Sequence, residues 1–195
     1  LFAGFENVML PNRLLAFGYT QSEALSVYGI LTGMAMSVIM FPSVLTNSVS
    51  VLLLPTISEA QAAGKRDKIL YTIKKTIESC LLLGFISTAG FLITGNFLGN
   101  FLFKNALAGT FIATLGWLCP FLYLSSTLSS ILHGLGHPGI TFELNLISCT
   151  IRILFVLLAV PTFGIRSYLW GILVSQAATA LLSILILLRK TSLNQ

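Results

Sequence analysis

The chain has 195 residues, of which 55% are hydrophobic and only 9% are charged, and its formal net charge is +5. A soluble domain carries about 25% charged residues, so this composition excludes an ordinary soluble domain and predicts several membrane spans. The positive charge does not indicate nucleic-acid binding, because the basic residues stand near the ends of apolar segments. We therefore expect the lipid bilayer as a partner and no nucleic acid.

Apolar segments follow one another along the chain, separated by short polar connections. In chain order they cover about 1–10, 25–55, 72–98, 106–132, 140–160 and 167–188. The first is too short for a complete span, because about 20 residues are needed to cross the hydrocarbon core. We expect an all-α polytopic bundle with five complete spans and a truncated first helix, in one domain over 1–195. Since the chain begins with Leu1, we expect it to be a fragment.

The stretch from Ala24 to Ser58 contains no acidic, basic or histidine side chain. As a helix it would be roughly 50 Å long, against a hydrocarbon core of about 30 Å. Pro42 stands near its middle, where it removes a backbone donor and predicts a bend. Pro120 holds the same position in the 106–132 segment. We expect both prolines to act as hinges.

Small and polar residues divide the Ala24–Ser58 stretch at its central proline. Three small residues spaced four apart precede the proline and predict close packing by another helix: Gly29, Gly33 and Ser37. Three polar residues on one helical face follow it: Ser43, Asn47 and Ser50. We expect this polar face to line a cavity. The alternative is that its hydroxyls satisfy the carbonyl groups that the proline leaves without a donor.

Arg152 is a basic residue inside the apolar 140–160 segment. Charged side chains at such depth are rare, and they usually face a bundle interior or a wet cavity. Thr141, Asn145 and Ser148 share its helical face, so we expect Arg152 to face inward. There it would hold an anionic group or pair with a carboxylate, for which Glu6, a second candidate cavity residue, is available. The alternative is that the long side chain reaches the membrane surface.

The sequence contains no set of nucleophile, base and orienting acid. Cys80, Cys119 and Cys149 stand alone in three different apolar segments, so they form neither a disulfide framework nor a metal-binding pattern. We expect no enzymatic activity, no metal site and no cofactor.

Four motifs, in this order and spacing, are similar to those of a known family. They are P-x-R-L at 11–14, YGILTGMAM at 28–36, FPSVLTNSVSVLLLPTISEA at 41–60 and ILHGLGHP at 131–138. Together they resemble the stage V sporulation protein B-like branch of the multidrug/oligosaccharidyl-lipid/polysaccharide exporter superfamily.

The resemblance implies the C-terminal six-helix lobe of a two-lobed transporter whose N-terminal lobe is absent from this chain. It also implies a flippase that moves a lipid-linked sugar of the undecaprenyl-pyrophosphate type across a bacterial plasma membrane by alternating access. Such a flippase serves cell-wall, peptidoglycan or spore-cortex polysaccharide synthesis. Its partners would be the lipid-linked sugar and the missing lobe. A multidrug/cation antiporter of the same superfamily and a non-transporting membrane scaffold stay open as alternatives.

Basic residues are distributed unevenly between the two ends of the expected spans. One end carries the connections 58–75 and 133–139 and the C-terminal tail, with these Lys and Arg residues: Lys65, Arg66, Lys68, Lys74, Lys75, Arg189 and Lys190. The other end carries the loops at 11–23, 99–105 and 161–166, with Arg13, Lys104 and Arg166. By the positive-inside rule, the first end is cytoplasmic.

This assignment predicts how cysteines introduced at the two ends react in intact cells. A cysteine at Ala63 should stay unlabelled by a membrane-impermeant thiol reagent, whereas one at Phe103 should be labelled. Both should react in permeabilised cells, which controls for local burial. Labelling at position 63 without labelling at 103 would reverse the assignment.

Overall fold

The computed structural model describes the backbone of residues 2–192 and the side chains of residues 8–189. Within that range every regular element is a helix, and η1 and η2 are π-helical segments. The elements are α1 (Phe2–Phe17), α2 (Gln21–Gly29), η1 (Ile30–Ala35), α3 (Met36–Met40), α4 (Ser43–Ala62), α5 (Arg66–Phe103), α6 (Ala106–Gly116), α7 (Cys119–Gly134), α8 (Pro138–Leu154), η2 (Phe155–Ala159), α9 (Val160–Phe163) and α10 (Ile165–Ser192).

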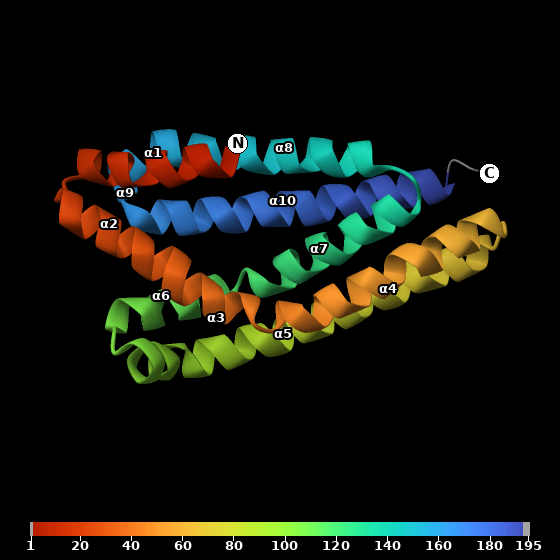
Figure 1. The fold of residues 1–195 in the computed structure, drawn as a ribbon, viewed down its shortest axis with the longest axis horizontal. Helices are drawn as coiled ribbons and strands as arrows, with labels where there is room; N and C mark the ends of the chain where they lie inside the picture. The colour runs from red at the N-terminus through yellow and green to blue at the C-terminus, as the bar shows by residue number, and fades with distance from the viewer. Residues whose placement is uncertain (1, 193–195) are drawn as a thin grey trace.

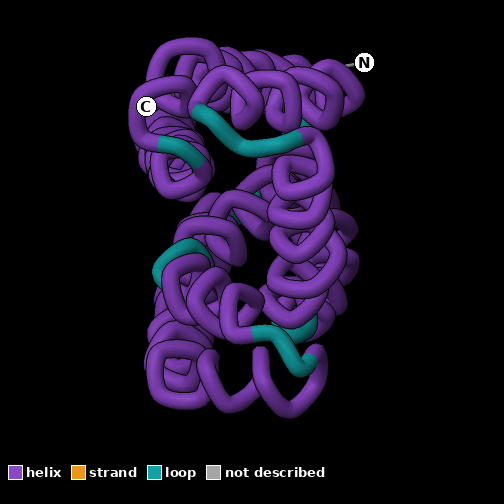
Figure 2. The backbone as a smooth tube through the Cα atoms, turned by 90° about the vertical axis from the view of Figure 1, so that its left-hand side faces the viewer, coloured by secondary structure: helices purple, strands orange, loops and turns teal. Residues whose placement is uncertain are grey.

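The helices run roughly along the long axis of the molecule (Figure 1). The α4–α5 and α7–α8 connections and the last turns of α10 lie at one end, and the α1–α2, α5–α6 and α9–α10 connections lie at the other (Figure 1). Seen along this axis, the helices form two groups, with α1 and α8–α10 in one and α2–α7 in the other (Figure 2). Contacts between α7 and α10 and between α1 and α2 join the groups.

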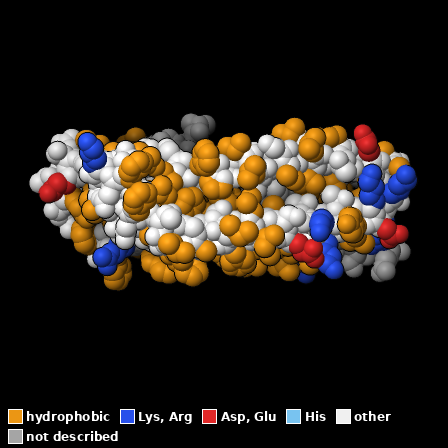
Figure 3. Space-filling view, turned by 90° about the horizontal axis from the view of Figure 1, so that it is seen from below, with side chains coloured by type: hydrophobic (Ala, Val, Ile, Leu, Met, Phe, Trp, Pro, Cys, Tyr) orange, Lys and Arg blue, Asp and Glu red, His pale blue; other side chains and the backbone are white. Residues whose placement is uncertain are grey.

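On the face that Figure 3 shows, apolar side chains cover the middle of the molecule and charged side chains lie toward its two ends. Among the described residues, four helical stretches are long and apolar enough to cross a membrane: Gln21–Met40, Arg66–Phe103, Pro138–Phe163 and Ile165–Arg189. Helices α6 and α7 are long and apolar enough to cross a membrane when they are taken together, and the chain bends by 58° between them. The long axis of the molecule is therefore the direction in which it would cross the bilayer.

Where the sequence predicts one helix over 25–55, the structure has two helical segments. The first ends at Met40, and the second, α4, begins at Ser43. Phe41 and Pro42 form a turn between them, and the chain changes direction there (Figure 1). The physical reason is that Pro42 has no N–H to donate to the carbonyl of residue 38. Phe41 N donates to Val38 O instead, at 3.2 Å. The second bend, between α6 and α7, also lies beside a proline, Pro120.

Two further boundaries differ from the expected ones. Helix α1 continues past the expected end at 10, through Pro11 to Phe17, and α5 continues past the expected end at 98 to Phe103. Two glycines near the end of α5 are contact points with α6. A Cβ atom at Gly99 would clash with the backbone of Gly109, and one at Gly95 would lie 3.0 Å from Ala113 N. Glycine there allows two backbones to approach closely.

The predicted packing ladder of Gly29, Gly33 and Ser37 is exposed in the structure. No described atom outside the local backbone lies within 4 Å of a Cβ atom built on Gly29 or Gly33. Among the described residues the ladder meets no other helix, so the predicted close approach of another helix stays a prediction. The close helix contacts are made instead by the glycines of α5.

Candidate functional site

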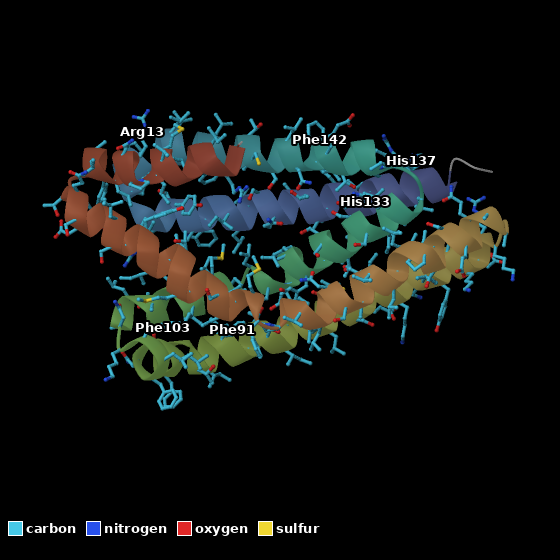
Figure 4. All side chains as sticks on the ribbon, in the orientation of Figure 1. Arg13, Phe91, Phe103, His133, His137 and Phe142 are labelled. Carbon is cyan, nitrogen blue, oxygen red and sulfur yellow. The ribbon has the colours of Figure 1, made fainter. Side chains whose placement is uncertain are left out.

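Helix α7 lies at the centre of the α2–α7 group, in contact with α4, α5 and α10. One side of α7 stays partly exposed between α4 and α10. It carries polar side chains at helical spacing: Ser126, Ser129, Ser130 and His133. We call these four residues the serine face. His133 lies near the end of α7, and His137 lies at the start of α8, on the other side of the turn (Figure 4). The serine face therefore runs from the middle of α7 to the basic end of the molecule.

Two amide side chains border the serine face, one on each neighbouring helix. Ser126 Oγ lies 3.4 Å from Oδ1 of Asn47 on α4. Ser125 Oγ donates to Oε1 of Gln176 on α10 at 3.0 Å. No hydrogen bond from the amide nitrogen of Asn47 or Gln176 to another described residue is present. Each amide can therefore donate to a ligand or to water beside the serine face.

The serine face differs from the sides of the bundle that would meet lipid. The exposed side of α5 carries large apolar groups such as Leu82, Phe85 and Ile93, which are 60–81% exposed. Ser129 Oγ donates within its own helix, to Ser125 O at 2.8 Å, so the lone pairs of its oxygen stay available. The serine face thus offers uncharged donors and acceptors, and it is suited to water, a polar ligand or another polar protein surface.

Acidic side chains lie away from the serine face in the described part of the chain. They stand near the ends of α2, α4 and α5 (Glu23, Glu59 and Asp67), in the fourth turn of α5 (Glu78) and in the second turn of α8 (Glu143). No group of three or more His, Cys, Asp or Glu side chains that could hold a metal ion occurs among the residues searched. The serine hydroxyls of this face and the two bordering amides can donate and accept hydrogen bonds, and they carry no charge.

Asn47 is the predicted cavity residue that the structure brings to this face. Ser43 and Ser50, which the sequence placed beside it, are 7% exposed and lie in the packed side of α4. Ser43 Oγ donates to Met40 O at 2.6 Å, which is the alternative role that the sequence left open. The burial of Ser43 and Ser50 favours this packing role, and the lining of a cavity by these two serines stays a prediction. The spacing i, i+4, i+7 spreads over about 60° of a helix, enough to place Asn47 outside and the serines inside.

Arg152 is half-buried near the end of α8, where η2 begins. Its Nη2 lies 3.6 Å from Cys149 Sγ. Of the residues that share its helical face, Thr141 and Ser148 are buried but Asn145 is exposed. This face of α8 therefore points only partly into the bundle. The Glu6 side chain lies outside the described residues.

Sequence reasoning missed Gln176 and did not assign the serines of α7. The available signal was polarity inside apolar segments: five hydroxyl residues between positions 125 and 130, and one amide in the middle of 167–188. Which of these side chains would be exposed depends on how α7 packs between its neighbours, and one-dimensional spacing does not contain that information.

Long apolar helices with charges gathered at both ends and an internal polar face define a polytopic helical membrane protein. Comparison with curated proteins then confirms the resemblance that the motifs predict. Stage V sporulation protein B of Bacillus subtilis (strain 168) is 28% identical over 180 residues, which are 91% of this chain and 35% of that protein. Sporulation protein YkvU of the same organism is 35% identical over 72 residues, 37% of this chain and 16% of that protein.

The chain therefore spans about a third of the length of the first of these relatives (35%). No protein-family model matches the chain, and no solved structure matches it. The similarity thus concerns one segment of a longer relative.

The serine face should be accessible to water, whereas the lipid side of α4 should not. In a variant without Cys149, a cysteine replacing Ser129 should react with a charged, water-soluble thiol reagent in membranes. A cysteine replacing Leu52, which is 68% exposed on α4, should react far more slowly because it faces hydrocarbon. Cys80 and Cys119 are buried and can stay in place. Equal reactivity at both positions would contradict this account of the surface.

Proposed function

We propose that the complete protein carrying this chain is a flippase-type transporter that moves a lipid-linked sugar across a membrane. The single observation that carries the proposal is the uncharged polar face of α7 bordered by Asn47 and Gln176. Sugar hydroxyls both donate and accept hydrogen bonds, and serine hydroxyls and amides match them in both roles. The lipid part of such a substrate can stay in the bilayer while the sugar passes along the polar face.

The similarity to stage V sporulation protein B supports this proposal. It favours a bacterial plasma membrane and polysaccharide synthesis for the cell wall, with a peptidoglycan precursor as the substrate. The carrier would be of the undecaprenyl-pyrophosphate type. We also propose that a second lobe, outside this chain, faces the serine face and completes the cavity, and that the protein is not an enzyme.

Movement between lobes requires helices that can change direction. The breaks beside Pro42 and Pro120 are candidates for this role, because each joins two helical segments that are separately packed. π-Helical segments often occur at functional positions, and η2 directly follows the α8 turn that carries Arg152. We propose that Arg152 holds the pyrophosphate, since a guanidinium can donate two hydrogen bonds to one phosphate group. A structural pair with a carboxylate is the alternative for this residue.

A cation antiporter of the same superfamily is less well supported. Such a transporter would need a carboxylate within the membrane to couple cation movement. The described carboxylates stand near helix ends, in the fourth turn of α5 or in the second turn of α8, away from the serine face. A non-transporting scaffold would have no use for unfilled hydrogen-bonding groups at mid-membrane.

The test is a leaflet-accessibility assay with the complete protein in proteoliposomes and a labelled lipid-linked oligosaccharide. Asn47→Ala and Gln176→Ala should each slow translocation about two- to twelve-fold, the loss expected from one hydrogen bond of about 0.5–1.5 kcal/mol. Ser48→Ala is the matched control, because Ser48 neighbours Asn47 in the chain and its hydroxyl bonds within α4, to Val44 O. Unchanged rates for both amide variants, or no translocation by the wild type, would contradict the proposal.

The same assay separates the two roles of Arg152. If it binds phosphate, Arg152→Ala should slow translocation more than Arg152→Lys, with unchanged protein level in the membrane. A low level of the alanine variant, with normal translocation per molecule, would assign Arg152 to a structural pair.

A further inference from the structure

A groove separates α4 from α5 on the side of the hairpin away from the serine face. Its volume is about 330 Å³. Tyr71, Thr72 and Lys75 line the end nearest the α4–α5 connection, whereas Leu45, Val49 and Leu83 line the opposite end. The groove thus has a polar, basic end and an apolar end, and its length from Tyr71 to Leu83 is about 18 Å along α5.

The position of charges along α5 places the groove relative to the bilayer. From Ser79 to Phe103 the helix has no acidic or basic side chain, and this stretch is about 37 Å long, enough to cross a hydrocarbon core of about 30 Å. Lys74, Lys75 and Glu78 therefore stand at the membrane surface. The polar end of the groove lies at the level of the lipid headgroups, and the apolar end lies within the hydrocarbon.

The charge around the polar end is predominantly positive. From Glu59 to Glu78 the hairpin carries five basic side chains, at positions 65, 66, 68, 74 and 75, against three carboxylates. These charges cluster where α4 meets α5 (Figure 3). Lys75 and Tyr71, one helical turn apart, are both exposed, so an ammonium and a phenol stand together over the groove.

We propose that this groove binds an anionic phospholipid of the leaflet on the basic side. The phosphate accepts hydrogen bonds from Lys75 and Tyr71, and one acyl chain lies along Val49 and Leu83. From Ser79, where the uncharged stretch of α5 begins, the groove extends about 6 Å further to Leu83, so its apolar end meets the first part of an acyl chain in this leaflet. The proposal does not depend on the proposed transport function, because the groove lies on the opposite side of α4 from Asn47.

The test is a titration of phosphatidylglycerol into the complete purified protein in detergent, with bound lipid counted by native mass spectrometry. Lys75→Gln should weaken binding about five-fold, as expected for one basic residue near a charged lipid surface. Lys74→Gln removes the same charge from the next position, which does not line the groove, and should weaken binding less than two-fold. Phosphatidylcholine should bind far more weakly than phosphatidylglycerol.

A second pair of variants tests the apolar end. Val49→Trp should fill the groove and reduce phosphatidylglycerol binding, whereas Leu52→Trp, on the exposed lipid side of α4, should not. Equal effects of the two lysine variants would show a diffuse attraction to the surface and overturn the site. Unchanged binding by Val49→Trp, or preferential retention of a polyprenyl phosphate, would overturn the proposed occupant. Because Lys75 is exposed, its variant is expected to fold even if the tryptophan variant does not.

Discussion

The structure depends on how the backbone is satisfied at the break beside Pro42. In a membrane an unsatisfied carbonyl group costs several kcal/mol, and the break leaves the carbonyls of Ile39 and Met40 outside the regular helical ladder. Backbone bonds there span three residues, as in Val44 N to Phe41 O. Ser43 Oγ donates to Met40 O, and the hydroxyl of Tyr123 donates to Ile39 O at 3.1 Å. Tyr123 is fully buried and lies on α7. A hydrogen bond from α7 therefore satisfies a carbonyl group at the break between α3 and α4.

This bond joins α7 to α3 at the break, and other contacts join α7 to α4. Toward the basic end α7 and α4 approach until a Cβ atom on Gly134 would lie 2.9 Å from Leu54 O, and Ser58 Oγ donates to Gly134 O at 2.9 Å. Tyr123 faces α3 and Gly134 faces α4, and the three helical turns between them place Ser126 beside Asn47 and leave Ser129 partly exposed. The serine face is thus a consequence of how the broken helices are held together.

The sequence predicts the parts of this arrangement that depend on local chemistry. The apolar segments, the break at Pro42 and the polarity after it can be recognised because charge, proline and hydroxyl groups act locally. The orientation of each helix could not be predicted, since it depends on contacts far apart in the chain. Gly29 and Gly33 have a packing pattern but face outward, whereas Gly95 and Gly99, for which the sequence predicts no packing role, allow α6 to approach α5. For the same reason spacing alone does not show that Ser43 and Ser50 are buried while Asn47 is exposed.

The most direct measurement is a double-mutant cycle on the unfolding of the complete protein in detergent. Tyr123→Phe should lower the free energy of unfolding by about 1 kcal/mol, because it leaves the buried Ile39 carbonyl without a donor. Tyr71→Phe, at an exposed position, should have little effect. In a Pro42→Ala background, where the regular helical bonds can form, the cost of Tyr123→Phe should largely disappear. An equal cost of Tyr123→Phe in both backgrounds, or none in either, would contradict the claim that Tyr123 on α7 satisfies a carbonyl group at the break between α3 and α4.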